Sequence, residues 1–188
     1  MSAGTAQPVG TTRRTGWWVA VTAVSVVVIG ITITWAFFVM RSVMDVGGAC
    51  ADGGPYVSAQ PCPDAAWLLP VAVPVMLLTA IFGSMAATTV NAPNLLIPMW
   101  ALLFGSLGWN FLEYAFIGPD VVWGWLVCGV LFWLMAAPAV FLMLVAVKNA
   151  VVPPREERSS GARWWVPAYS ALFAVGFLIG AWSYDAIS

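Results

Sequence analysis

Histidine is absent from this chain of 188 residues, and charged residues of either sign are few. Without an imidazole we expect no histidine-ligated haem, no common catalytic zinc site and no His-based catalytic triad. Charged residues make up 8% and the net charge is −1, so no basic patch is available for a nucleic acid. No Gly-rich loop ends in Lys-Ser or Lys-Thr, which excludes a P-loop nucleotide site. We therefore predict no catalytic residue, cofactor or metal, and no nucleic-acid partner.

Hydrophobic residues, in contrast, make up 62% of the chain. This fraction lies well above the range of soluble domains, and the polar residues are too few to cover such a fold in water. Lipid must therefore be the solvent for most of the side chains. The composition predicts an integral membrane protein.

Five apolar runs are each long enough to cross the hydrocarbon core as a helix, which takes about 20 residues. Strand-type alternation over about 10 residues is absent, so helices are favoured over a membrane β-barrel. The fold class that we predict is an all-α integral membrane protein, a bundle of five transmembrane helices within a membrane domain 17–188. The predicted parts are a disordered tail 1–16, spans 17–40, 66–88, 95–117, 121–147 and 164–184, loop 41–65 and linker 148–163.

The first apolar run could instead be an export signal, because Arg13 and Arg14 precede it. A signal core is usually about 7–15 residues long and ends at small residues. This run has 24 uncharged residues and closes with bulky side chains at Phe37–Met40. Gly48-Ala49-Cys50 lies beyond Arg41, too far from the apolar core for a lipoprotein cleavage site. We expect the run to be retained as a span.

The distribution of cations predicts the orientation. With the N-terminus in the cytoplasm, six cations lie inside and only Arg41 lies outside, which satisfies the positive-inside rule. The six are Arg13, Arg14, Lys148, Arg155, Arg158 and Arg163. Five spans then leave the C-terminus and loop 41–65 outside the cytoplasm. We expect a multi-pass protein of a plasma membrane, and the abundance of Val, Ala and Trp with a single Lys is typical of bacteria with GC-rich DNA.

Two of the three cysteines, Cys50 and Cys62, lie in loop 41–65 among Gly and Pro residues. An oxidising exterior and two cysteines in one constrained loop predict a disulfide. A structural staple is favoured over a catalytic thiol pair, because the Cys-x-x-Cys spacing of redox enzymes is missing. Cys128 lies within the fourth span, where a free cysteine usually behaves as a small hydrophobic residue.

Glu113 is the one formally charged residue within a predicted span. Ser106, Asn110 and Glu113 are spaced so that they share one face of the third helix. Glu113 lies about four residues from the outer end of its span, or roughly 6 Å below the interface. Arg41 ends the first span at a similar depth. We therefore expect either an Arg41–Glu113 pair or a hydrogen bond from a loop backbone to Glu113, with proton or ion handling as the alternative role.

Small residues at helical spacing predict close contacts between spans. Packing within the bundle is favoured over a dedicated oligomer interface, because such spacings arise easily in Ala/Gly-rich spans. The sets are Gly176 and Gly180; Ala80, Ser84 and Thr88; Ala101, Gly105 and Gly108; and Thr22, Ser25, Ile29, Thr32 and Ala36.

Three functions remain open at this level. The first is a non-enzymatic structural or accessory component that packs against itself or a membrane-protein partner, since the parts outside the spans are too small for a catalytic domain. The second is a proton- or solute-handling transporter or channel, a homo-oligomer that works through Glu113 and Asn110. A membrane enzyme acting on lipid or quinone at the outer surface ranks last. The partners expected are membrane lipids and either another membrane protein or further copies of the chain.

Overall fold

The computed structural model describes residues 10–48, 50, 61–151 and 162–188. These residues form five α-helices and one 3-10 turn, and no strand occurs among them. The elements are α1 (Gly10–Asp45), η1 (Asp64–Trp67), α2 (Leu68–Thr89), α3 (Leu96–Phe116), α4 (Trp123–Val151) and α5 (Ala162–Asp185). The all-helical prediction is confirmed for the described residues.

The first helix is longer than the span predicted for it. α1 begins at Gly10, so the structure differs from the predicted disordered tail over residues 10–16, while residues 1–9 lie outside the described part. It also continues from Met40 to Asp45, into the predicted loop. The reason is that hydropathy marks where lipid ends, whereas a helix that is already nucleated adds further turns at little cost. Consequently, Arg41 stands on a helix and not on a loop.

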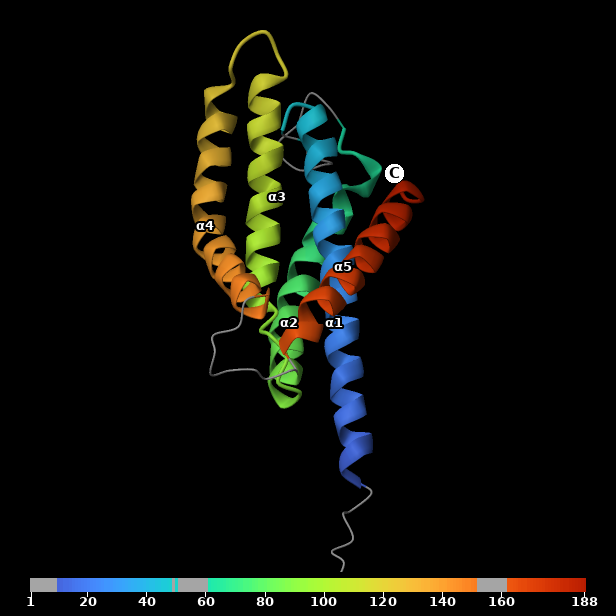
Figure 1. The fold of residues 1–188 in the computed structure, drawn as a ribbon. Helices are drawn as coiled ribbons and strands as arrows, with labels where there is room; N and C mark the ends of the chain where they lie inside the picture. The colour runs from blue at the N-terminus through green and yellow to red at the C-terminus, as the bar shows by residue number, and fades with distance from the viewer. Residues whose placement is uncertain (1–9, 49, 51–60, 152–161) are drawn as a thin grey trace, which may run out of the picture.

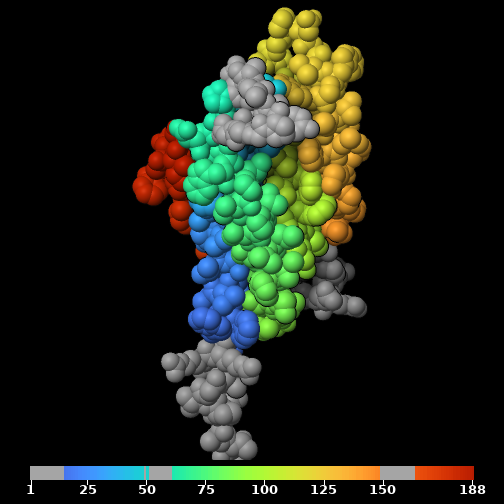
Figure 2. Space-filling model, turned by 180° about the vertical axis from the view of Figure 1, so that it is seen from behind, coloured from blue at the N-terminus to red at the C-terminus, as the bar shows by residue number. Residues whose placement is uncertain are grey.

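The helices run alternately up and down, as Figure 1 shows. α1 contacts α2, α5 and α3; α3 pairs with α4; and α4 also touches α5. Seen from behind, α2 covers the middle of the molecule, with α4 along one edge and α5 along the other (Figure 2). α1 is therefore the helix around which the other elements are organised.

The side of α1 with small residues lies inside the bundle. Its predicted members Thr22, Ser25, Ile29, Thr32 and Ala36 are all buried. The three hydroxyls donate to carbonyl oxygens one turn earlier in the same helix, at 2.8–2.9 Å. Each hydroxyl is thus satisfied within α1 and leaves no polar group unpaired in the bundle.

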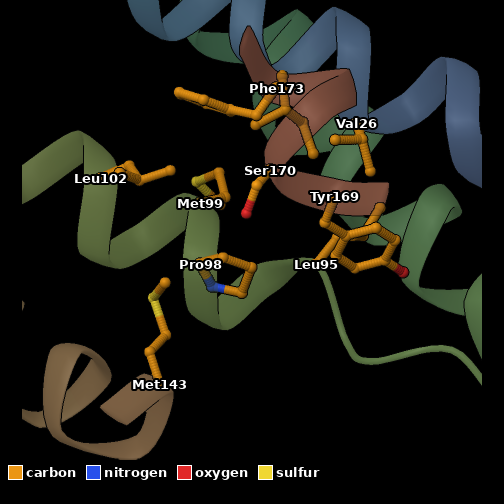
Figure 3. A pocket seen from close by; sticks show the side chains of 10 residues that line it. Val26, Leu95, Pro98, Met99, Leu102, Met143, Tyr169, Ser170 and Phe173 are labelled. Carbon is orange, nitrogen blue, oxygen red and sulfur yellow. The ribbon is translucent and has the colours of Figure 1, made fainter. Parts of the chain in front are cut away.

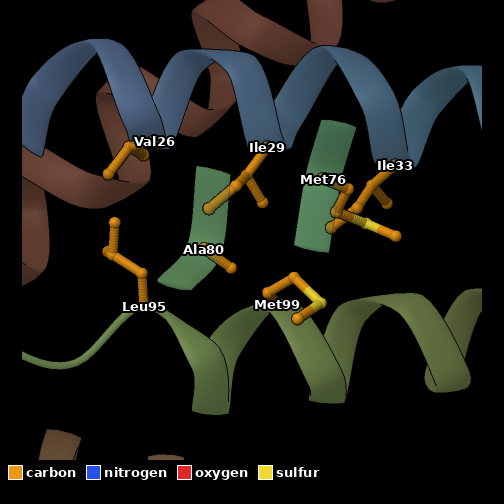
Figure 4. Close-up of a cluster of buried hydrophobic side chains, with 7 residues drawn as sticks. All are labelled: Val26, Ile29, Ile33, Met76, Ala80, Leu95 and Met99. Atoms are coloured by element: carbon orange, nitrogen blue, oxygen red, sulfur yellow. The ribbon is translucent and has the colours of Figure 1, made fainter. Parts of the chain in front are cut away.

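An apolar cluster fills the space between α1, α2 and α3 (Figure 4). Ile29 and Ile33 of α1 point toward Met76 of α2 and Met99 of α3, and all four side chains are buried. Lipid tails are as apolar as these residues, so the cluster stabilises the bundle mainly through close packing and dispersion. It fixes the rotation of α3 relative to α1.

Glycines allow the closest helix approaches. A Cβ at Gly176 of α5 would overlap the carbonyl oxygen of Val27 in α1, and one at Gly180 would lie 2.8 Å from the Cβ of Thr34. In α3, a Cβ at Gly108 would overlap the Trp133 side chain of α4. The predicted contacts at these glycines are confirmed.

Gly105 is different, because nothing lies within 4 Å of a Cβ built there. The predicted contact at Gly105 is wrong. The two positions are three residues apart and so about 60° apart around the helix axis. α4 packs against α3 at Gly108 and at Leu112, but no neighbour reaches α3 at Gly105.

Four of the helical segments are long and apolar enough to cross a membrane. They are Thr15–Asp45, Asp64–Thr89, Trp123–Lys148 and Trp164–Asp185. α3 is not among them, because Asn110, Glu113 and several small residues lower its mean hydropathy. Exposed tryptophans stand near the ends of these segments, as expected for rings at the headgroup level. They are Trp17, Trp67, Trp123, Trp164 and Trp182.

Candidate functional site: a polar clasp between α1 and α3

The charged residue of α3 is held by the one described cation at its end of the bundle. Arg41 Nη1 donates to Glu113 Oε2 at 2.6 Å, and Nη2 donates to Oε1 at 2.9 Å. Two parallel charge-assisted bonds are the strongest arrangement open to an arginine and a carboxylate. Of the two partners left open by the sequence for Glu113, the structure shows Arg41.

Asn110, one turn before Glu113, extends this contact toward the bundle interior. Its side chain is fully buried and donates from Nδ2 to the Phe37 carbonyl oxygen at 3.1 Å. Its Oδ1 accepts from Arg41 Nη1 at 3.3 Å. Because both ends of this amide face α1, Asn110 fixes the register between α1 and α3.

Tyr114 closes the cluster on the other side. Its hydroxyl donates to an Asp45 carboxylate oxygen and lies 3.4 Å from the Arg41 carbonyl oxygen. The Arg41 guanidinium lies 5.4 Å from the centroid of the Tyr114 ring and 5.6 Å from that of Phe37, within the range of cation–π attraction. We call Arg41, Asp45, Asn110, Glu113 and Tyr114 the polar clasp.

Ser106 does not join the polar clasp. Its hydroxyl donates to the Leu103 carbonyl oxygen of the same helix at 3.0 Å. Ser106 shares the Asn110 face of α3, as the spacing indicated, but it lies one turn further from Arg41. The structure therefore brings together three of the four predicted polar residues, Arg41, Asn110 and Glu113.

The chemistry open to the polar clasp is that of a paired, partly accessible site. The Arg41 and Glu113 side chains keep 28% and 34% of their exposure, so water or headgroups can reach the pair. Within the described part of the chain, no buried side-chain nitrogen or oxygen lacks a hydrogen-bond partner. The carboxylate of Glu113 is thus occupied on both oxygens by Arg41, which favours holding helices together over passing protons.

A second set of contacts attaches α5 to the same end of α1. Trp35 Nε1 donates to Ser183 Oγ at 2.9 Å, and the Ser42 and Tyr184 hydroxyls are hydrogen-bonded to each other. The Tyr184 ring stacks on Phe38 at 5.3 Å. Together with the polar clasp, these contacts make this end of α1 the meeting point of α3 and α5.

Cys50 and Cys62 form the predicted disulfide, with their Cα atoms 4.9 Å apart. The bridge connects the region after α1 to the residues before η1, and Ala65 and Leu68 there are buried beside Val39 of α1. It therefore stabilises the entry into α2. Cys128 is unbridged and exposed on α4, where lipid would contact it. We call the end of the bundle that carries this bridge the disulfide end.

No group of three or more metal-ligating side chains occurs among the described residues. Comparison with known protein families, curated proteins and solved structures finds no match. What the polar clasp does must therefore be argued from its own geometry.

The sequence interpretation missed two members of the polar clasp, Asp45 and Tyr114. A signal was present, since Asp45 lies four residues after Arg41 and Tyr114 directly follows Glu113. It would have required the knowledge that α1 remains helical up to Asp45, because only then do Arg41 and Asp45 share one face. The predicted span ended at residue 40, before α1 ends, and Asp45 was therefore not recognised as a neighbour of Arg41.

Proposed function

We propose that this chain is a five-span protein of a plasma membrane, with a cytoplasmic N-terminus and an external C-terminus, that serves as a non-enzymatic structural or accessory component of a membrane assembly. The observation that carries the proposal is the polar clasp. Its intramembrane carboxylate is engaged by Arg41 through two hydrogen bonds and is tied to α1 again through Asn110. Such a site stabilises a particular helix arrangement.

The proposal counts α3 as a span. Its 21 residues extend about 31 Å, close to the roughly 30 Å of a hydrocarbon core. It lies antiparallel beside α4 over the same height, as Figure 1 shows. Of its two most polar residues, Glu113 is paired with Arg41 of α1, and Asn110 is buried and donates to the Phe37 carbonyl oxygen. The low hydropathy of α3 is therefore compatible with crossing inside a bundle.

The accessory role is supported by the outward faces of α4 and α5. Large apolar side chains such as Phe141, Leu144 and Leu178 are exposed along them. α4 and α5 are thus far less covered by the rest of the bundle than α1, which is half buried. These faces are available to lipid, to another membrane protein or to a second copy. Bacterial origin and the plasma membrane stay predictions from composition.

The alternative, a proton- or solute-handling homo-oligomer, rests on the partial exposure of Glu113 and on its contact with Asn110 through Arg41. In that case the Arg41–Glu113 pair would open during the cycle. Such a protein would lose flux when Glu113 is neutralised, without losing its fold.

The experiment is purification of the tagged full chain in a gentle detergent, with mass determination and identification of whatever is retained. A foreign membrane protein in fixed stoichiometry supports the accessory role and identifies the assembly. The matched control is the same chain with Gly176→Leu, because a larger side chain at this position cannot fit against α1. This variant should lose the partner if the partner binds only when α5 is packed on α1.

A second measurement addresses the alternative. Wild type, Glu113→Gln and Asp120→Asn are placed in liposomes, and proton flux is followed with an entrapped pH dye. Asp120 is exposed in the α3–α4 turn and serves as the charge-matched control. A pH-dependent flux that Glu113→Gln alone abolishes, in a variant that still elutes as a folded protein, would overturn the accessory proposal.

A further inference from the structure

α4 consists of two parts that contact the rest of the bundle differently. Residues 123–137 pack closely on α3. A Cβ at Gly129 would lie 2.8 Å from the Leu112 side chain of α3, and the Phe132 ring stacks on Phe104 of α3 with the centroids 5.8 Å apart. This part of α4 therefore forms one unit with α3.

Residues 139–148, which we call the α4 arm, are held by far fewer contacts. Ala139 is buried and Met143 is half-buried, but every other side chain of the α4 arm is exposed. Met143 lines a cavity of about 300 Å³ together with residues of α1, α3 and α5, such as Leu102 and Phe173 (Figure 3). The α4 arm thus forms one wall of this cavity, away from the disulfide end. A segment with so few buried contacts opens at a low cost in free energy.

The two parts of α4 meet at Pro138, and the helix turns inward at this end of the bundle, as Figure 1 shows. Proline has no N–H to donate to the Leu134 carbonyl oxygen, and its ring pushes the preceding turn of the helix apart. The backbone of α4 is therefore weakest at the joint between the part packed on α3 and the α4 arm. A change of bend at this joint moves the α4 arm relative to the cavity and leaves the contacts of residues 123–137 intact.

Trp100 of α3 bonds to the turn of α4 that Pro138 weakens. Its Nε1 donates to the Met135 carbonyl oxygen at 3.1 Å. Its ring contacts that of Phe104, with the centroids 4.4 Å apart, which restrains the direction of the indole N–H. The hydrocarbon core of a bilayer holds no water that could satisfy the carbonyl groups of a bent turn, so a side-chain donor takes its place. Trp100 therefore stabilises α4 in its bent form.

We propose that the α4 arm is a lid on the cavity between α1, α3, α4 and α5, hinged at Pro138 and held closed by the bond from Trp100 to Met135. In the closed form Met143 completes the wall of the cavity. When the bond from Trp100 breaks, the α4 arm swings away from α5 and opens the cavity to the bilayer, while residues 123–137 stay on α3. This inference concerns the motion of α4 and is independent of the proposed accessory role.

The test measures the distance between the α4 arm and α5 by pulsed electron paramagnetic resonance, on the full chain in phosphatidylcholine liposomes. Nitroxides are attached at Leu144→Cys and Leu178→Cys, which replace exposed side chains on the two helices. The background carries Cys128→Ser and keeps the Cys50–Cys62 bridge intact. Without a further change, this protein should show one main distance, that of the closed lid.

Two variants weaken the closed form from different sides. Trp100→Phe keeps the aromatic ring but removes the N–H, and Met143→Ala removes the half-buried side chain of the α4 arm. Trp100→Phe should raise the ratio of open to closed molecules about three-fold, the effect of one hydrogen bond within a membrane protein, and so add a longer distance. The double variant should show more of this longer distance than either single variant. Trp123→Phe, the same substitution at an exposed tryptophan before the bend, should change nothing.

A second label pair, Leu131→Cys with Leu178→Cys, separates motion of the lid from motion of the whole helix. Leu131 is exposed on the part of α4 that packs on α3, so its distance to α5 should stay the same in every variant. Elution volume and helical circular dichroism establish that each variant is folded.

Two results would overturn the proposal. One is a folded double variant, Trp100→Phe with Met143→Ala, whose distances from Leu144 to Leu178 equal those of the parent protein. The other is a change at Leu131 as large as that at Leu144, because α4 would then move as one body without a hinge at Pro138.

Discussion

At the scale of single residues, Arg41 and Glu113 depend on each other. Both are partly exposed, so their bond is worth less than a fully buried ion pair, but removing one partner leaves a charge beside apolar helices. We expect Glu113→Ala to lower the free energy of unfolding by about 1–3 kcal/mol. Thermal unfolding in detergent measures it, with Asp120→Asn as an unaffected control.

A charge swap separates pairing from unrelated damage. Arg41→Glu and Glu113→Arg should each lower the melting temperature, and the double variant should recover most of the loss, because it restores opposite charges across the same contact. Losses that simply add in the double variant would contradict the pairing.

A contact between residues could be predicted from the sequence where their positions along the spans place them at the same depth in the membrane. Arg41 and Glu113 both lie near the outer ends of their spans, so a contact between them could be anticipated. The bonds of Asn110 to Phe37 and of Tyr114 to Asp45 could not, because they depend on how α3 is rotated relative to α1. That rotation is set by the packing of side chains such as Ile29 and Met99, which leaves no periodic signal.

At the scale of elements, the α1–α5 contact can be tested with two glycines. A Cβ at Gly176 would overlap the backbone of α1, whereas one at Gly105 meets nothing within 4 Å. Gly176→Ala should therefore destabilise the protein by about 1–3 kcal/mol. Gly105→Ala should be neutral or stabilise by up to about 1 kcal/mol, because alanine favours helix.

Thermal unfolding of the two alanine variants in one detergent measures this difference. The variants share the same chemistry and differ only in their neighbours. Equal effects of the two substitutions would mean that α5 is not seated on α1 through Gly176.

The disulfide acts on the connection between α1 and α2. It closes a loop over a sequence separation of 12 residues, for which the chain-entropy model gives about 2–3 kcal/mol. Cys62→Ser should lower the melting temperature as much as a reductant lowers that of wild type, and the reductant should not affect the variant further. Cys128→Ser should leave both values unchanged.

The helices were easier to predict than the residues at which they end or the cavity between them. Runs of about 20 apolar residues gave the existence of all five helices, since lipid permits almost no other backbone structure. The first helix nevertheless extends from Gly10 to Asp45, past both ends of its apolar run. The cavity beside Met143 and Ser170 was not anticipated, because it results from the spacing between α4 and the other helices.

At the scale of the whole molecule, the number of crossings decides the orientation of every part after α2. If α3 crosses, the α2–α3 turn at Ala92 and the α3–α4 turn at Asp120 lie on opposite sides of the membrane. If α3 does not cross, the two turns lie on the same side, and Ser188 shares the side of the N-terminus. The cation distribution and the 21-residue length of α3 favour the crossing.

Single cysteines at these three positions, in a Cys128→Ser background, distinguish the two arrangements. A membrane-impermeant thiol reagent added to intact cells should label Asp120→Cys and Ser188→Cys but not Ala92→Cys, which should react only after the membrane is opened. Cys50 and Cys62 are bridged and should remain silent without reductant. Labelling of Ala92→Cys and Asp120→Cys from the same side would exclude the five-span topology. In that arrangement the polar clasp would lie between a spanning α1 and an α3 that does not cross the bilayer.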